Sequence, residues 1–330
     1  MTMETPGSAA CGTKLSRYQV RPYRANGGFE AGGVMMLVSA LAIAGAGLGF
    51  AAHWIAQYFY LIFLFPAAIG LGLGAVGVRM IRQGRVRNPW IGGLAGFVGG
   101  AMAMFMMHYF DYQEFKGMVD KLPPALREVA QLAPQERMAA VKPDLSPADR
   151  QVAESLLRMA SVRNMLDYMN FAAEQGVKIK RAAHSGGKPM NLGFWGSYVY
   201  WVLEILIVAG LTFLMVHTAA VAPYCAKCGR WKQAKTIGAA GGNMQSFVTA
   251  AVAGDLEAAK AAKGTDADGP LKVTVACCDG CVGEGDVDVK LELATVNKKG
   301  ETSTKKLAHL TYPAEALAAW VGLMGENKPR

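Results

Sequence analysis

Four cysteines are arranged in two pairs that could hold a metal ion. Cys225 and Cys228 form one Cys-x-x-Cys pair, Cys278 and Cys281 form another, and Cys277 directly precedes the second pair. Tetrahedral zinc takes four thiolates at about 2.3 Å, and a two-residue gap lets one tight turn present two sulfurs to the same ion. The spacing therefore predicts a structural zinc site at Cys225, Cys228, Cys278 and Cys281. We expect Cys277 to be a buried core cysteine.

Other uses of these cysteines stay open. A dithiol such as Cys278 and Cys281 could exchange disulfides, although the βαβ setting of a thioredoxin-like motif is absent. Electron-transfer iron and a site without metal are further alternatives. The two pairs resemble the knuckles of zinc-ribbon and rubredoxin-like domains, and this resemblance covers the four cysteines and their immediate neighbours alone. Cys228 and Cys278 are 50 positions apart, so we expect a helix inserted between the knuckles.

Glu204 is a second candidate, because it is the single acidic residue of an apolar stretch from 196 to 219. An acidic residue inside a membrane-spanning helix usually faces the interior of a helical bundle and pairs with a polar group. Such a residue suggests a path for protons or ions. His108, near the outer end of the preceding apolar segment, is the best-placed partner by depth. The alternative is that a protonated Glu204 hydrogen-bonds a neighbouring helix and only fixes the bundle.

The apolar segments predict a membrane protein. Hydrophobic residues make up 52% of the chain. No Asp, Glu, Lys or Arg occurs from 31 to 78, a stretch that can hold two spans of about 20 residues. We predict spans at 33–52, 57–78, 90–110 and 196–219, with 53–56 as a tight joint. Glycines four positions apart in the second and third spans predict close helix packing. Aromatic residues near the span ends, Trp201 among them, are typical of an interfacial belt.

Basic residues predict the orientation. Arg79, Arg82, Arg85 and Arg87 lie between the second and third spans, whereas the joint between the first and second carries no charge. Lys and Arg in short loops stay on the cytoplasmic side. Both termini are therefore expected in the cytoplasm, with the chain crossing the cell (inner) membrane. Reduced thiolates suit the same compartment.

These observations predict an α-helical integral membrane bundle of four transmembrane helices, an extracytoplasmic helical insertion and a C-terminal α+β zinc-ribbon-like domain. The expected parts are a cytoplasmic N-terminal segment (1–29), three transmembrane helices (30–110), the extracytoplasmic segment (111–195), the fourth transmembrane helix (196–219) and a cytoplasmic zinc domain (220–330).

Local patterns predict some elements of these parts. In the outer segment, Ser146 is expected to cap a helix that begins at Pro147. In the C-terminal domain we expect a helix at 244–262, strands near 271–275 and 287–293, a hairpin turn at 297–300 and a helix from Pro313.

The function that these features favour is a non-enzymatic membrane scaffold, sensor or complex subunit, because no complete catalytic or nucleotide-binding constellation is visible. The alternative is a small oligomeric transporter or channel subunit that uses Glu204. A membrane-bound thiol redox protein, or an enzyme built from Glu204, His108, Asp111 or His184, comes third. Expected partners are the lipid bilayer and either other proteins or further copies of the chain.

The net charge of +9 raises the question of nucleic acid. The basic stripe beside the first knuckle has a simpler explanation as a cytoplasmic anchor next to a span. It comprises Arg230, Trp231, Lys232 and Lys235. We therefore do not expect nucleic acid as a partner.

Overall fold

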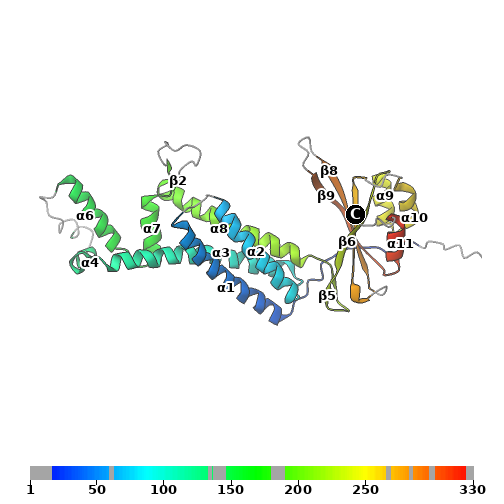
Figure 1. The fold of residues 1–330 in the computed structure, drawn as a ribbon, viewed down its shortest axis with the longest axis horizontal. Helices are drawn as coiled ribbons and strands as arrows, with labels where there is room; N and C mark the ends of the chain where they lie inside the picture. The colour runs from blue at the N-terminus through cyan, green and yellow to red at the C-terminus, as the bar shows by residue number, and fades with distance from the viewer. Residues whose placement is uncertain are drawn as a thin grey trace, which may run out of the picture. The chain divides into compact units, whose positions relative to one another are not determined.

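A computed structural model describes residues 17–58, 63–132, 136, 146–179, 190–264, 269–281, 285–296 and 302–324. The chain divides into two compact units, one of helices and one with a β-sheet (Figure 1). One unit is the helical stretch 28–220, and the other joins the residues up to Gly27 to those from Val221 onward. The described residues of the N-terminal segment up to Gly27 therefore group with the C-terminal domain, through the pairing of β1 (Arg21–Pro22) with β9 (Thr302–Tyr312).

The helical unit contains four helices that are long and apolar enough to cross a membrane. They are α1 (Ala31–Ala56), α2 (Leu64–Gln83), α3 (Pro89–Asp120) and α8 (Gly193–Ala220). Their number and approximate positions agree with the predicted spans. The bounds differ, because residues 53–56 form the last turn of α1 instead of a joint. In addition, α3 continues ten residues beyond the predicted end at 110.

Glycines let the long helices approach closely, as predicted. A Cβ added at Gly96 would lie 3.0 Å from the carbonyl oxygen of Thr212 in α8, and one at Gly100 would lie 2.6 Å from the Cα of Ala209. The Thr212 hydroxyl, fully buried, donates to the carbonyl oxygen of Gly70 in α2 at 3.2 Å. Small residues at such crossings replace side-chain volume with direct backbone contact.

The segment between α3 and α8 contains α4 (Pro124–Ala130), α6 (Pro147–Ala160), α7 (Met165–Gln175) and the short pair β2 (Lys178–Ile179) and β3 (Met190–Asn191). Ser146 caps α6 as predicted, since its hydroxyl accepts from the amide of Asp149 at 3.2 Å. The helix α7 packs on α8 through a cluster formed by Ala173, Tyr200 and Trp201. This part of the segment therefore docks on the long helices.

The second unit is built on a five-stranded antiparallel sheet of order β1-β9-β8-β7-β6. The strands are β1 (Arg21–Pro22), β6 (Gln233–Ala240), β7 (Leu271–Cys277), β8 (Val287–Val296) and β9 (Thr302–Tyr312). The two predicted strands correspond to β7 and β8, whereas β1, β6 and β9 were not predicted. The predicted turn at 297–300 lies outside the described residues.

Three helices cover one face of this sheet: α9 (Met244–Val252), α10 (Leu256–Ala262) and α11 (Ala316–Met324) (Figure 1). The prediction of one continuous helix over 244–262 is wrong. Gly254 has a φ of +76°, and the Asp255 side chain accepts from the amide of Ala258 at 2.9 Å to cap a new helix. The last helix begins three residues after the predicted start at Pro313.

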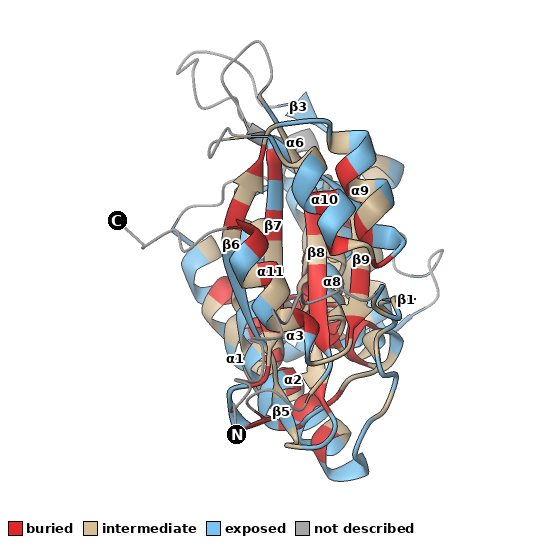
Figure 2. Ribbon diagram, turned by 90° about the vertical axis from the view of Figure 1, so that its right-hand side faces the viewer, coloured by how far each residue is buried: buried red, intermediate tan, exposed pale blue. Residues whose placement is uncertain are grey.

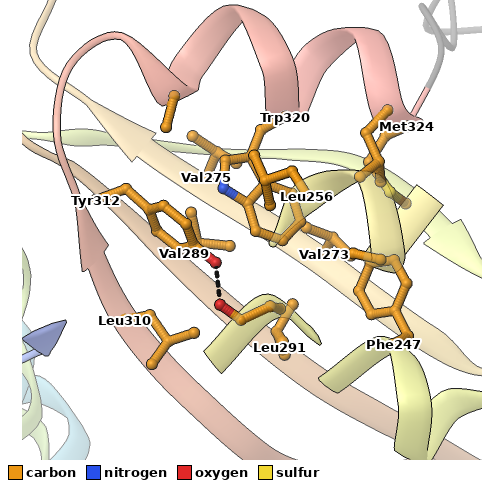
Figure 3. Close-up of a cluster of buried hydrophobic side chains, with 14 of the residues drawn as sticks. Phe247, Leu256, Val273, Val275, Val289, Leu291, Leu310, Tyr312, Trp320 and Met324 are labelled. Carbon is orange, nitrogen blue, oxygen red and sulfur yellow. Dashed lines mark hydrogen bonds between the residues drawn. The ribbon is translucent and has the colours of Figure 1, made fainter. Parts of the chain in front are cut away.

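The core of the second unit lies between these helices and the sheet. Figure 2 shows buried residues along β7 and β8, and β9 adds Leu310 and Tyr312 near its end. Trp320 is fully buried, with its ring 5.4 Å from that of Tyr312 and 6.3 Å from that of Phe247 (Figure 3). The Tyr312 hydroxyl donates to the carbonyl oxygen of Ala251 in α9. This bond ties the last strand to the helical layer.

Candidate metal centre

The first cysteine pair lies on a small hairpin formed by β4 (Tyr224–Cys225) and β5 (Arg230–Trp231). The turn between them closes through a hydrogen bond from the amide of Gly229 to the carbonyl oxygen of Cys225, at 3.0 Å. Gly229 has a φ of +64°, which side-chain-bearing residues rarely adopt. Glycine after the pair is therefore required by the backbone.

The second pair follows the end of β7. Cys277 is the last residue of that strand and pairs with Gln233, while Cys281 closes the short 3₁₀ helix η1 (Asp279–Cys281). A Cβ at Gly280 would lie 3.2 Å from the sulfur of Cys228. A glycine at this position therefore lets the two turns approach each other.

The four predicted ligands meet at one point. Their sulfur atoms all lie within 4.8 Å of one another, and those of Cys225 and Cys281 are 3.5 Å apart. Sulfurs at the corners of a tetrahedron around zinc at about 2.3 Å would be about 3.8 Å apart. A disulfide needs about 2.05 Å, and all described cysteines are free thiols. The donor set and spacing therefore fit a tetrahedral thiophilic metal ion.

The cluster is shielded from solvent but lies apart from the main core. Cys225, Cys278 and Cys281 are buried and Cys228 is half-buried, so the four form a small cluster of their own. Cys277 is half-buried and outside the group of four. The expectation of a buried core position for Cys277 was therefore too strong.

The thiols of Cys225 and Cys281 differ in their pKa values. Burial opposes ionisation of Cys225, but hydrogen bonds from the Cys228 backbone and from the neighbouring thiols lower its pKa to about 7. Cys281 acts in the opposite way, because its hydrogen bond to Cys228 and its burial raise its pKa to about 12. The geometry thus favours ionisation of Cys225 over that of Cys281. A divalent cation would compensate the charge of the other thiolates.

The structure also brings the second pair of candidates together. Glu204 and His108 line one cavity of about 210 Å³ in the helical unit, and Glu204 is only 2% exposed. Asp111 lines the same cavity, and one of its oxygens lies 2.5 Å from Nδ1 of His53. The pairing of His53 with Asp111 was missed, because these residues are 58 positions apart and belong to different helices.

Trp201 also belongs to this cavity. It was expected in an interfacial belt, but it is 9% exposed and forms part of the cavity wall. The helical periodicity of the sequence could have placed Trp201 beside Glu204. The two residues are three positions apart and therefore lie on the same side of α8.

The fold and the cysteine cluster define a class of protein: four long apolar helices joined to an α+β sheet domain with a potential metal centre. No family model, no curated protein and no solved structure matches the chain. The resemblance of the cysteine pairs to zinc-ribbon knuckles is therefore local.

Proposed function

We propose that this chain is a multi-pass protein of the cell membrane whose four apolar helices anchor a zinc-stabilised cytoplasmic domain. That domain acts as a scaffold or complex subunit that binds another protein. The observation that carries the proposal is the convergence of four cysteine sulfurs within 4.8 Å. Four protein ligands fill a tetrahedral zinc site and leave no position for a substrate, which is typical of structural zinc.

The sheet supports the proposed topology. β1 precedes the first long helix, β9 follows the last, and they pair through Arg21 with Thr311 and Pro22 with Leu310. Segments on opposite sides of a membrane cannot form one sheet. The pairing therefore requires an even number of crossings between them, in agreement with four spans. The arginines around α2 and α3 then favour the cytoplasm for this side, where free thiols persist.

A sheet edge supports a scaffolding role. β6 is an edge strand of the sheet, and its first four residues, from Gln233 to Thr236, are exposed. An exposed edge offers unpaired backbone groups to which a partner can add a strand. The buried β7 on the other side of β6 fixes the position of this edge. We propose a protein partner that binds there.

Metal analysis of the full-length protein in detergent tests the zinc site. We expect one zinc per chain in the wild type, and loss of zinc in Cys225→Ser and Cys278→Ser. Cys277→Ser is the matched control and should retain the metal, because Cys277 is outside the group of four. Bound iron would replace zinc in the proposal. An absence of metal together with a reversible disulfide would favour the thiol redox alternative.

Partner binding is tested by co-purification in mild detergent. We expect a stoichiometric protein partner with the wild type and with Cys277→Ser. That partner should be lost with Thr236→Pro, since proline at an exposed edge removes a backbone donor. Recovery of the same partner with the edge variant would exclude β6 as the binding surface.

The transporter or channel alternative is favoured by one observation, the shared cavity of Glu204 and His108. Its test is flux of protons or ions into liposomes. If Glu204→Gln leaves assembly intact and abolishes flux, transport is the function. Equal flux in protein-free liposomes and in liposomes with the wild type would exclude it.

A further inference from the structure

The cavity in the helical unit has a composition that suits a particular kind of ligand. It lies where α3, α7 and α8 meet and has a volume of about 210 Å³. Its walls combine acidic, aromatic and sulfur-containing side chains. They are Met107, His108, Asp111, Tyr168, Met169, Ala172, Tyr200, Trp201 and Glu204. No lysine or arginine is among these lining residues.

Two carboxyl groups make the cavity a site for positive charge. Glu204 is 2% exposed and is the single acidic residue of α8, and acidic residues inside apolar helices usually face a polar or cationic group. Asp111 is held by His53, whose Nδ1 lies 2.5 Å from one carboxylate oxygen. Its other oxygen lies 3.5 Å from Nδ1 of His108. Glu114 is outside the cavity and lies 3.5 Å from Nε2 of His53.

His108 adds a free acceptor. Its Nδ1 faces the Asp111 carboxylate, which favours the tautomer with the proton on Nδ1. Nε2 is then an acceptor, and this atom is buried without a hydrogen-bond partner among the described residues. Buried polar atoms are normally paired. The unpaired Nε2 in the cavity wall therefore indicates a missing donor.

Aromatic rings complete the walls. Trp201 is 9% exposed, and its ring lies 5.7 Å from that of His108 at an angle of 65°. Tyr168 from α7 and Tyr200 from α8 line the cavity with it. The faces of tryptophan and tyrosine attract cations, most strongly where water is excluded. Apolar walls and a few convergent polar groups are typical of small-molecule sites.

We propose that this cavity binds a small organic ammonium ion that carries N–H donors. The ammonium group would lie between Glu204 and Asp111 and donate to Nε2 of His108. Its alkyl part would contact the rings of Trp201 and Tyr200. Among the described residues, the cysteine cluster is the group whose donor atoms lie close enough to share one metal ion. The carboxylates and histidines of the cavity are not gathered in that way, which favours an organic cation over a metal ion.

The test uses full-length protein in detergent and isothermal titration calorimetry with n-propylammonium. 1-Propanol has a similar size without the charge, and tetramethylammonium has the charge without N–H donors. We expect saturable binding of n-propylammonium, weaker binding of tetramethylammonium and no binding of 1-propanol. Glu204→Gln should weaken binding by about tenfold or more, since it removes one of the two carboxyl groups that line the cavity. The control Glu174→Gln, which removes an exposed carboxylate of α7 outside the cavity, should bind as the wild type does.

Trp201→Leu provides an independent variant in case Glu204→Gln does not fold. It should weaken n-propylammonium binding several-fold, whereas the matched control Trp195→Leu should not, because Trp195 is 77% exposed. Three results would overturn the proposal. They are equal affinity for 1-propanol, unchanged affinity in folded Glu204→Gln or Trp201→Leu, and binding of Mn²⁺ or Zn²⁺ at this site in place of the ammonium ion.

Discussion

Replacement of Lys232 by methionine should destabilise the sheet domain severely. Lys232 was expected to be a cytoplasmic anchor beside the last span, and its side chain is 6% exposed while that of its partner Asp288 is 3% exposed. The lysine Nζ donates to an Asp288 oxygen at 2.7 Å and to the carbonyl oxygen of Asp286 at 2.6 Å. Thr311 donates to the second oxygen of Asp288 at 2.7 Å. In Lys232→Met the Asp288 carboxylate keeps only the hydrogen bond from the Thr311 hydroxyl.

The expected cost is about 3–5 kcal/mol, the range for removing one partner of a buried ion pair. Lys290→Met on the same sheet is the matched control, because the Lys290–Glu292 pair is partly exposed at 39% and 16%. Such pairs contribute about 0–1 kcal/mol. Lys232→Met combined with Asp288→Asn should recover much of the loss, since no unpaired charge is then buried.

Hydrogen exchange of the β7 and β8 amides in the full-length protein measures this cost. At about 1.36 kcal/mol per factor of ten, Lys232→Met should accelerate exchange by roughly 10²- to 10⁴-fold. Lys290→Met should accelerate it by less than about tenfold. If both variants exchange at the same rate, or if the double variant is less stable than Lys232→Met, the buried ion pair does not stabilise the domain as described.

Three further predictions concern other contacts. Gly100→Ala should lower the thermal unfolding midpoint in detergent, because its Cβ would meet the α8 backbone at 2.6 Å. Gly117→Ala is the control. Its Cβ would have nothing within 4 Å, so the midpoint should stay unchanged or rise. Burial, followed by the charge of Lys306, lowers the pKa of His309 to about 4, below the unfolded value of about 6.5. Between those values the unfolded chain binds a proton that the folded chain does not, so stability should fall from pH 6.5 to pH 4, and His309→Phe should show a smaller fall in its thermal midpoint. Tyr312→Phe should cost about 0.5–1.5 kcal/mol and accelerate exchange in α9, since it removes a buried hydrogen bond while the Ala251 carbonyl keeps the one from the amide of Gly254; exchange at the wild-type rate would contradict this role.

Long-range pairing explains what the sequence did not predict about the fold. The apolar helices were predictable because their length and composition are local properties. Two-residue β1 has no alternation to detect, and β6 contains small residues in place of a β-branched pattern. The break at Gly254 had a local signal, glycine followed by a capping aspartate. That signal was outweighed by the alanine-rich helical pattern on both sides.

The two candidate sites differ in the same way. The cysteine cluster was predictable because each pair contains its own turn, and four thiols of this spacing have one chemically simple arrangement. The cavity depends on where three helices cross. Glu204 and His108 were found because charged groups are rare in apolar helices, whereas the tyrosines and Trp201 resemble any other aromatic residues near a span end.

The pairing of β1 with β9 has a consequence for how the protein is made. β1 leaves the ribosome first, but its partner strand is synthesised only after all four long helices. Under the proposed topology, the sheet stays incomplete until the last long helix has been inserted. A chain that inserted three helices would hold the two strands in different compartments. Completion of the sheet would therefore distinguish correctly inserted chains from misinserted ones.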